Sequence, residues 1–176
     1  MNPSYSAVLK EYPKDQGWSL KDQVKSEPKI PSTKISEFDI VDVEGYSVTD
    51  AILENQKPTI WIINYKLPYS TGSNGIAWKD PFKTAYTQQL KPLATAAAAD
   101  GVQTITIVKE TGEDVMNSLG ALAGGQMTVY KADDILLKTI IRSNPGVLLM
   151  KDGQILEKYH IDQLPDYAEI KSKLKI

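Results

Sequence analysis

The sequence predicts an α/β domain in which helices flank a mixed β-sheet. Strand and helix patterns alternate from Phe38 onward, and this alternation favours parallel strands with helical crossovers. The last two strand patterns, 146–151 and 154–160, are joined by Asp152-Gly153, which is typical of an antiparallel hairpin. The chain has 176 residues, of which 41% are apolar and 24% charged. This is the composition of a globular protein of about one domain, not of a disordered chain.

The pattern begins with a strand at residues 38–43, which ends in the turn Glu44-Gly45. Thr49 is expected to cap a short helix over residues 50–54, because a threonine hydroxyl can accept hydrogen bonds from first-turn amides. Residues 59–65 are β-branched and apolar on both faces. They therefore predict a central strand that is buried on both sides.

A long helix is predicted after a loop over residues 66–79. Asp80 is expected at its N-cap and Pro81 at its first helical position, where a missing N–H costs nothing. The apolar spacing carries the helix to about Ala99. Pro92 falls inside it and should kink or split it, because proline cannot donate the backbone bond of an α-helix.

The second half of the chain continues the alternation up to the closing hairpin. Asp133 precedes an apolar periodic segment and is expected to cap a helix. The predicted elements are a strand at 104–108, a helix at 113–123, a short strand at 127–130, a helix at 133–141, the hairpin strands at 146–151 and 154–160, and a terminal helix that ends near residue 174.

Residues 1–37 are predicted to be a polar N-terminal extension or linker, and residues 38–176 to be the folded domain. Prolines punctuate the extension, and its six lysines nearly cancel its five acidic residues. No apolar run approaches the ~20 residues of a spanning helix. The N-terminus also lacks the basic start and apolar run of a signal peptide. We therefore expect either a cytosolic protein or an excised part of a longer one.

Composition excludes several classes of function. The chain has no cysteine, one histidine and a net charge of −2. Without cysteine there is no disulfide, thiol nucleophile, thiolate-bound zinc or iron–sulfur cluster in this chain. The near-neutral charge gives no reason to expect a nucleic-acid partner. We expect neither a metal site nor a cofactor.

Two segments resemble the thioredoxin fold. Asn144-Pro145 and the apolar strand and Asp-Gly turn after it resemble the segment in which a cis-proline precedes a strand and a tight turn. The run Trp78-Lys79-Asp80-Pro81-Phe82-Lys83 resembles the active-site sequence Trp-Cys-Gly-Pro-Cys-Lys, with Lys79 and Phe82 at the positions of the two cysteines. The ten residues 67–76 are extra between strand and helix. The resemblance implies a thioredoxin-like sheet over about 38–174 and a cis Asn144–Pro145 bond.

A narrower resemblance covers residues 35–53 and 137–153. Both segments are similar to the soluble domain attached to DoxX-type membrane proteins of Bacteroidetes, in which a helical membrane domain precedes a thioredoxin-like domain that often lacks the redox pair. This resemblance implies a covalently linked membrane domain outside this chain. It also implies that the chain is the soluble part of an inner-membrane protein, with a cytoplasmic location as the alternative.

No catalytic residue stands out in this sequence. Thiol–disulfide exchange needs a thiolate, so we expect neither disulfide oxidoreductase nor peroxiredoxin activity from this chain. His160 is the one histidine able to act as a general base near neutral pH. No nucleophile elbow of the form Gly-x-Ser-x-Gly accompanies it, so a surface role is favoured.

The resemblance instead implies a groove between two segments. One is the start of the helix near Phe82, where the redox proteins have their active site, and the other is the loop that contains Asn144 and Pro145, called the proline loop below. Redox members hold extended peptides there by backbone pairing. We expect the groove to be lined by Trp78, Lys79, Phe82, Asn144 and Pro145, and to bind a protein or peptide partner. The other interpretation, which is favoured for the aromatic side chains of this region, is that they only fill the space of a lost active site. The alternatives are an enzyme that uses His160 or a carboxylate-bound metal on this scaffold, and a purely structural domain.

Overall fold

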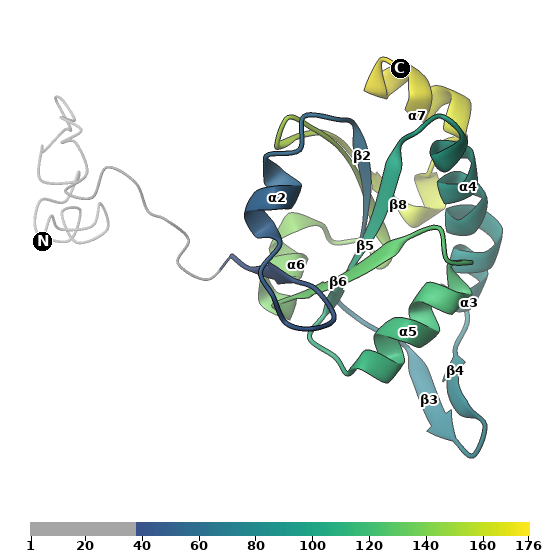
Figure 1. The fold of residues 1–176 in the computed structure, drawn as a ribbon. Helices are drawn as coiled ribbons and strands as arrows, with labels where there is room; N and C mark the ends of the chain where they lie inside the picture. The colour runs from purple at the N-terminus through teal and green to yellow at the C-terminus, as the bar shows by residue number, and fades with distance from the viewer. Residues whose placement is uncertain (1–37) are drawn as a thin grey trace, which may run out of the picture. The chain divides into compact units, whose positions relative to one another are not determined.

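The computed structural model of the protein describes residues 38–176, which belong to one compact unit. The expected extension over residues 1–37 lies outside the described residues. A six-stranded sheet has the strand order β1-β6-β5-β2-β7-β8. Its strands are β1 (Ile40–Val41), β2 (Thr59–Asn64), β5 (Gln103–Lys109), β6 (Thr128–Ala132), β7 (Gly146–Lys151) and β8 (Gln154–His160). Strands β2, β5 and β6 are parallel, whereas β1, β7 and β8 pair antiparallel with their neighbours, so the predicted mixed sheet is confirmed (Figure 1).

Strand β2 lies in the interior of this sheet, and all six of its residues are buried. It pairs with β5 on one side and with β7 on the other, so that Ile62 lies between Thr106 and Val147. Its alternate residues serve two separate clusters: Ile60 and Ile62 enter one, and Trp61 and Ile63 enter the other. The two-faced apolar pattern of the sequence reflects this double burial.

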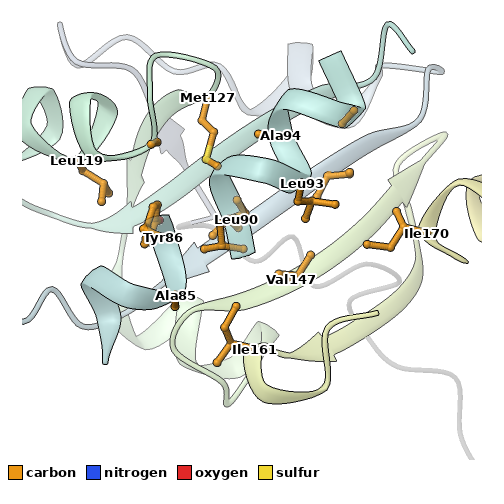
Figure 2. Packing of buried hydrophobic residues seen from close by; sticks show 14 of the residues in the cluster. Ala85, Tyr86, Leu90, Leu93, Ala94, Leu119, Met127, Val147, Ile161 and Ile170 are labelled. Atoms are coloured by element: carbon orange, nitrogen blue, oxygen red, sulfur yellow. The ribbon is translucent and has the colours of Figure 1, made fainter. Parts of the chain in front are cut away.

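Helices cover both faces of the sheet (Figure 1). The helical elements are α2 (Thr49–Leu53) and α6 (Asp134–Ile140) on one face, and α3 (Phe82–Ala85), η2 (Tyr86–Leu90), α4 (Lys91–Ala99), α5 (Glu113–Leu122) and α7 (Tyr167–Leu174) on the other. Figure 2 shows Leu90 and Leu93 of the long helix packed over Val147 of β7, with Ile170 of α7 beside them. None of the helices in residues 38–176 has the length and apolarity needed to cross a membrane.

The long helix is interrupted in the turn before Pro92, as predicted. Residues Tyr86–Leu90 form a π-helical turn, and the Lys91 amide donates to the Tyr86 carbonyl five residues back. Pro92 occupies the first turn of α4. An α-helix would require a hydrogen bond from position 92 to Gln88, and proline has no N–H to donate, so the wider turn accommodates it.

Two expected helix starts differ from the structure. Pro81, not Asp80, occupies the N-cap of α3. Asp80 lies one residue before the N-cap, and its Oδ1 accepts a hydrogen bond from the Thr84 amide at 3.2 Å. Thr49 lies inside α2 instead of capping it, because its hydroxyl accepts from the Ile40 amide at 2.8 Å. Asp133 does cap α6, as predicted, by accepting from two amides of the first turn.

The first strand is shorter than predicted, since only Ile40 and Val41 pair with β6. Asp42 ends it early: its side chain accepts from the Tyr46 amide at 2.8 Å and its carbonyl accepts from Gly45. The Asn144–Pro145 bond is cis, as the resemblance implies, and the Asp80–Pro81 bond is also cis.

The segment expected to be a loop over residues 66–79 contains a second sheet. Strands β3 (Tyr69–Gly72) and β4 (Gly75–Trp78) pair antiparallel around a two-residue turn, and the hairpin extends away from the six-stranded sheet (Figure 1). Gly75 closes the turn with a φ of +87°, which glycine adopts without steric cost. The Lys79 amide donates to the Pro68 carbonyl at 2.9 Å and ties the base of the hairpin together.

Candidate functional site

A small pocket lies where the start of α3 meets the proline loop. Its volume is about 110 Å³. Phe82 comes from the helix, Asn144 and Pro145 come from the loop, and Ile161 and Asp162 come from the segment after β8. The pocket therefore brings together three of the five residues predicted for the groove.

The other two predicted residues, Trp78 and Lys79, do not line this pocket. Trp78 closes the base of the hairpin, where its indole N–H donates to Ser118 Oγ of α5 at 3.0 Å. Lys79 is exposed, and its carbonyl accepts from the Lys83 amide. Of the two positions that the sequence resemblance matches to the redox cysteines, Lys79 is therefore exposed and Phe82 is buried.

A chain of four aromatic rings fills the space behind the pocket. Trp78 packs edge-on against Tyr69 at 5.6 Å between ring centroids and stacks on Phe82 at 5.3 Å. Phe82 in turn contacts Tyr86 at 4.8 Å. Phe82 is 3% exposed and Tyr86 is fully buried, so these rings contribute apolar packing at the start of α3 and in the π-helical turn that follows it.

The proline loop is held by side chains that the sequence analysis did not single out. Ser143 is buried, and its hydroxyl donates to the Pro145 carbonyl and accepts from the Ile161 amide at 3.0 Å. The Tyr65 hydroxyl donates to the Arg142 carbonyl at 2.6 Å. The only sequence signal for this role was the proximity of Ser143 to Pro145, since the partners are far along the chain.

The Asn144 side chain pairs with the backbone of Lys66 through two hydrogen bonds, as a neighbouring strand would. Its Oδ1 accepts from the Lys66 amide at 2.9 Å, and its Nδ2 donates to the Lys66 carbonyl at 3.0 Å. The backbone N–H and C=O of Asn144 have no hydrogen-bond partner among residues 38–176. The loop thus presents one unpaired donor and one unpaired acceptor beside the pocket, which is the pattern that an added strand can bind.

Titratable groups are sparse around this site. His160 is half-exposed outside the pocket, and its Nδ1 accepts from the Asp162 amide at 3.2 Å. Asp162 lines the pocket and is exposed. No three His, Asp or Glu side chains within residues 38–176 come close enough together to hold a metal ion. Backbone pairing and apolar contact are the interactions that this arrangement offers.

Solved structures with the same fold include three from bacteria. A secreted disulfide oxidoreductase of Mycobacterium tuberculosis has a TM-score of 0.51 at 17% identity, over 79% of this chain and 95% of that one. A putative thioredoxin from Neisseria meningitidis has a TM-score of 0.54 at 19% identity, over 79% and 85%. An uncharacterized thioredoxin-like protein from Porphyromonas gingivalis has a TM-score of 0.52 at 18% identity, over 78% and 86%.

No protein-family model matches the chain, and no curated protein matches it by sequence. The structural likeness establishes the fold: this is a thioredoxin-like domain, and the chain that forms it contains no cysteine. The Mycobacterium tuberculosis protein is by its description a disulfide oxidoreductase. That reaction needs a thiolate to attack a sulfur, and this chain has none to offer.

Proposed function

We propose that the domain is a redox-inactive protein-interaction module that captures an extended peptide segment at the pocket beside Pro145. The observation that carries this proposal is the unpaired backbone N–H and C=O of Asn144 next to an open pocket. An extended peptide would pair with these two groups as an added strand, and one of its side chains would enter the pocket.

The surroundings of Asn144 support this role. Its side chain is already engaged with Lys66, and Ser143 fixes the carbonyl of Pro145, so the loop is held in place before a peptide arrives. A binding surface that is ordered in advance loses less conformational entropy on association. Phe82, which lines the pocket, is itself packed between the rings of Trp78 and Tyr86.

Selection of peptides from a random displayed library against the full chain tests this proposal. Thr84 lines the pocket and is exposed, so Thr84→Arg would fill the pocket with a long side chain. Thr87→Arg is the matched control, because Thr87 is exposed on the same helical segment and does not line the pocket. We expect the selected peptides to lose binding to the Thr84→Arg variant and to retain it with Thr87→Arg. Equal binding to both variants would refute the pocket as the site.

We also propose that the domain acts beside a membrane, as the part of a DoxX-type protein that lies outside the bilayer. The support is the resemblance of residues 35–53 and 137–153 to that family. The coding sequence upstream of Met1 and the fractionation of the native protein test it. We expect a helical membrane domain in the same reading frame and recovery of the protein with membranes. A stop codon directly upstream combined with recovery in the cytosolic fraction would contradict it.

A further inference from the structure

A second, larger hollow lies next to the pocket beside Pro145, and the two share one lining residue. The second hollow has a volume of about 480 Å³ and lies between α4 and the segment that leads into α7. Gln89, in the π-helical turn, lines both hollows. We refer to the two hollows together as the Gln89 groove.

The walls of the larger hollow are mainly apolar. Its lining includes Pro92, Leu93, Ala96, Leu164, Pro165 and Tyr167. Ala96 contributes only a methyl group to this lining, and Pro92 and Pro165 contribute no backbone N–H groups. Burial raises the pKa of the Tyr167 hydroxyl to about 12, still further from physiological pH, and the group adds no charge to the hollow.

The charged residues that line the groove are both acidic. Asp162 stands at the smaller hollow and Asp166 at the larger one, and no Lys or Arg within residues 38–176 lines either hollow. Asp166 also caps α7 by accepting from the Glu169 amide at 2.9 Å. Asp162 Oδ2 lies 3.4 Å from His160 Nδ1 and is otherwise exposed to solvent. Two neighbouring hollows that are each lined by apolar side chains and one carboxylate are complementary to an apolar segment that carries positive charge.

We propose that the Gln89 groove binds an extended peptide whose apolar side chains occupy the larger hollow and whose Lys or Arg pairs with Asp162. The proposal rests on the peptide-binding role of the Pro145 pocket, and it adds the length of the site and the chemical class of the peptide. The apolar side chains supply most of the affinity, because the removal of apolar surface from water favours association. The ion pair at the exposed Asp162 selects basic over acidic segments.

The test uses the full chain and the peptides recovered by display, resynthesised and titrated by fluorescence anisotropy. Ala96→Arg fills the larger hollow, and Ala98→Arg is its matched control, since Ala98 is exposed on the same helix outside the lining. Asp162→Asn removes the charge with little change of shape. Thermal unfolding of each variant establishes that it remains folded.

We expect the selected peptides to be rich in apolar residues and to contain more Lys and Arg than Asp and Glu. Ala96→Arg should abolish their binding while Ala98→Arg preserves it. Asp162→Asn should weaken binding by about two- to fivefold, the range of an exposed ion pair, and added salt should reduce the effect.

Other outcomes separate the two proposals. Peptides that lose binding with Thr84→Arg but not with Ala96→Arg would overturn the longer groove and leave the Pro145 pocket in place. Peptides without basic residues would overturn the role of Asp162. Failure to select any peptide would overturn both proposals. Self-association that Ala96→Arg abolishes would make a second copy of the chain, not a peptide, the occupant.

Discussion

The carboxamide of Asn64 donates a hydrogen bond to the hydroxyl of Tyr86 inside the core, with 2.8 Å between Nδ2 and the oxygen. Both residues are fully buried. Burial raises the pKa of the Tyr86 hydroxyl above its usual range, so the phenol keeps its proton. The bond joins the end of the central strand β2 to the π-helical turn that borders the candidate site.

Replacing Tyr86 with Phe should destabilise the domain by about 1–3 kcal/mol, because a buried amide loses its partner without access to water. Urea denaturation followed by circular dichroism measures the change. Tyr46→Phe is the control, since Tyr46 is 73% exposed, and it should change the free energy of unfolding by less than about 0.5 kcal/mol. Equal stabilities of the two variants would show that the Asn64–Tyr86 bond contributes nothing.

A Gly146→Ala substitution should cost about 1–3 kcal/mol by overpacking. A Cβ at position 146 would lie 2.6 Å from Ile141 Cδ1 and 2.8 Å from its Cγ2, and Ile141 is itself only 8% exposed. The same substitution at Gly72 in the hairpin meets no atom within 4 Å and should be tolerated. Thermal unfolding of both variants checks the difference, and a Gly146→Ala protein as stable as Gly72→Ala would contradict the close packing.

Acid should remove a contribution to stability that comes from Asp100. Its carboxylate lies 2.8 Å from the Lys171 ammonium of α7, and this hydrogen bond holds the pKa of Asp100 below the ordinary value of 3.8. Because the folded pKa is lowered, the contribution is present above pH 3.8 and disappears as the pH falls through the folded value. Asp100→Asn should therefore lower stability at neutral pH and match the wild type in strong acid.

Lys171→Gln offers a second variant for the same pair. If the two residues act through one contact, the double variant Asp100→Asn/Lys171→Gln should lose less stability at neutral pH than the two single changes combined. Denaturant titrations at several pH values measure these differences. A constant gap between the wild type and Asp100→Asn down to the lowest pH would contradict the assignment.

The purified chain should not accelerate the reduction of insulin disulfides by dithiothreitol. The catalysed reaction proceeds through a mixed disulfide between insulin and a thiol of the enzyme, and this chain contains no cysteine. The turbidity assay for insulin aggregation measures the rate, with a thioredoxin as the positive control. Acceleration by protein shown by mass spectrometry to be free of contaminating oxidoreductase would refute the argument.

The hairpin of β7 and β8 was predicted to the residue because two strong strand patterns flank an Asp-Gly turn. The smaller hairpin of β3 and β4 was missed because its strands have only four residues each and β3 is largely exposed and polar. Its local signal was present: Ser73-Asn74 lies between two glycines, which suits a two-residue turn. Weak strand propensity concealed it.

The residues of the candidate site could be predicted from the sequence only in part, because some of them belong to no local motif. Phe82, Asn144 and Pro145 belong to the local runs that resemble thioredoxin, and the structure places them around one pocket. Trp78 belongs to the same run, but its bond to Ser118, 40 residues away, places it behind the pocket. Gln89 belongs to no local motif: it lies in the widened turn before Pro92, and only the fold brings that turn to the pocket.

The tip of the small hairpin makes the chain convenient for site-specific labelling. Ser73 is exposed in the two-residue turn, and Gly72 beside it has no atoms within 4 Å of a Cβ built there. Since the natural chain has no thiol, a Ser73→Cys substitution would provide a single maleimide attachment point without removal of any native cysteine. A spin label or fluorophore there would report on the tip of the hairpin, whose base packs through Trp78 against Phe82 of α3.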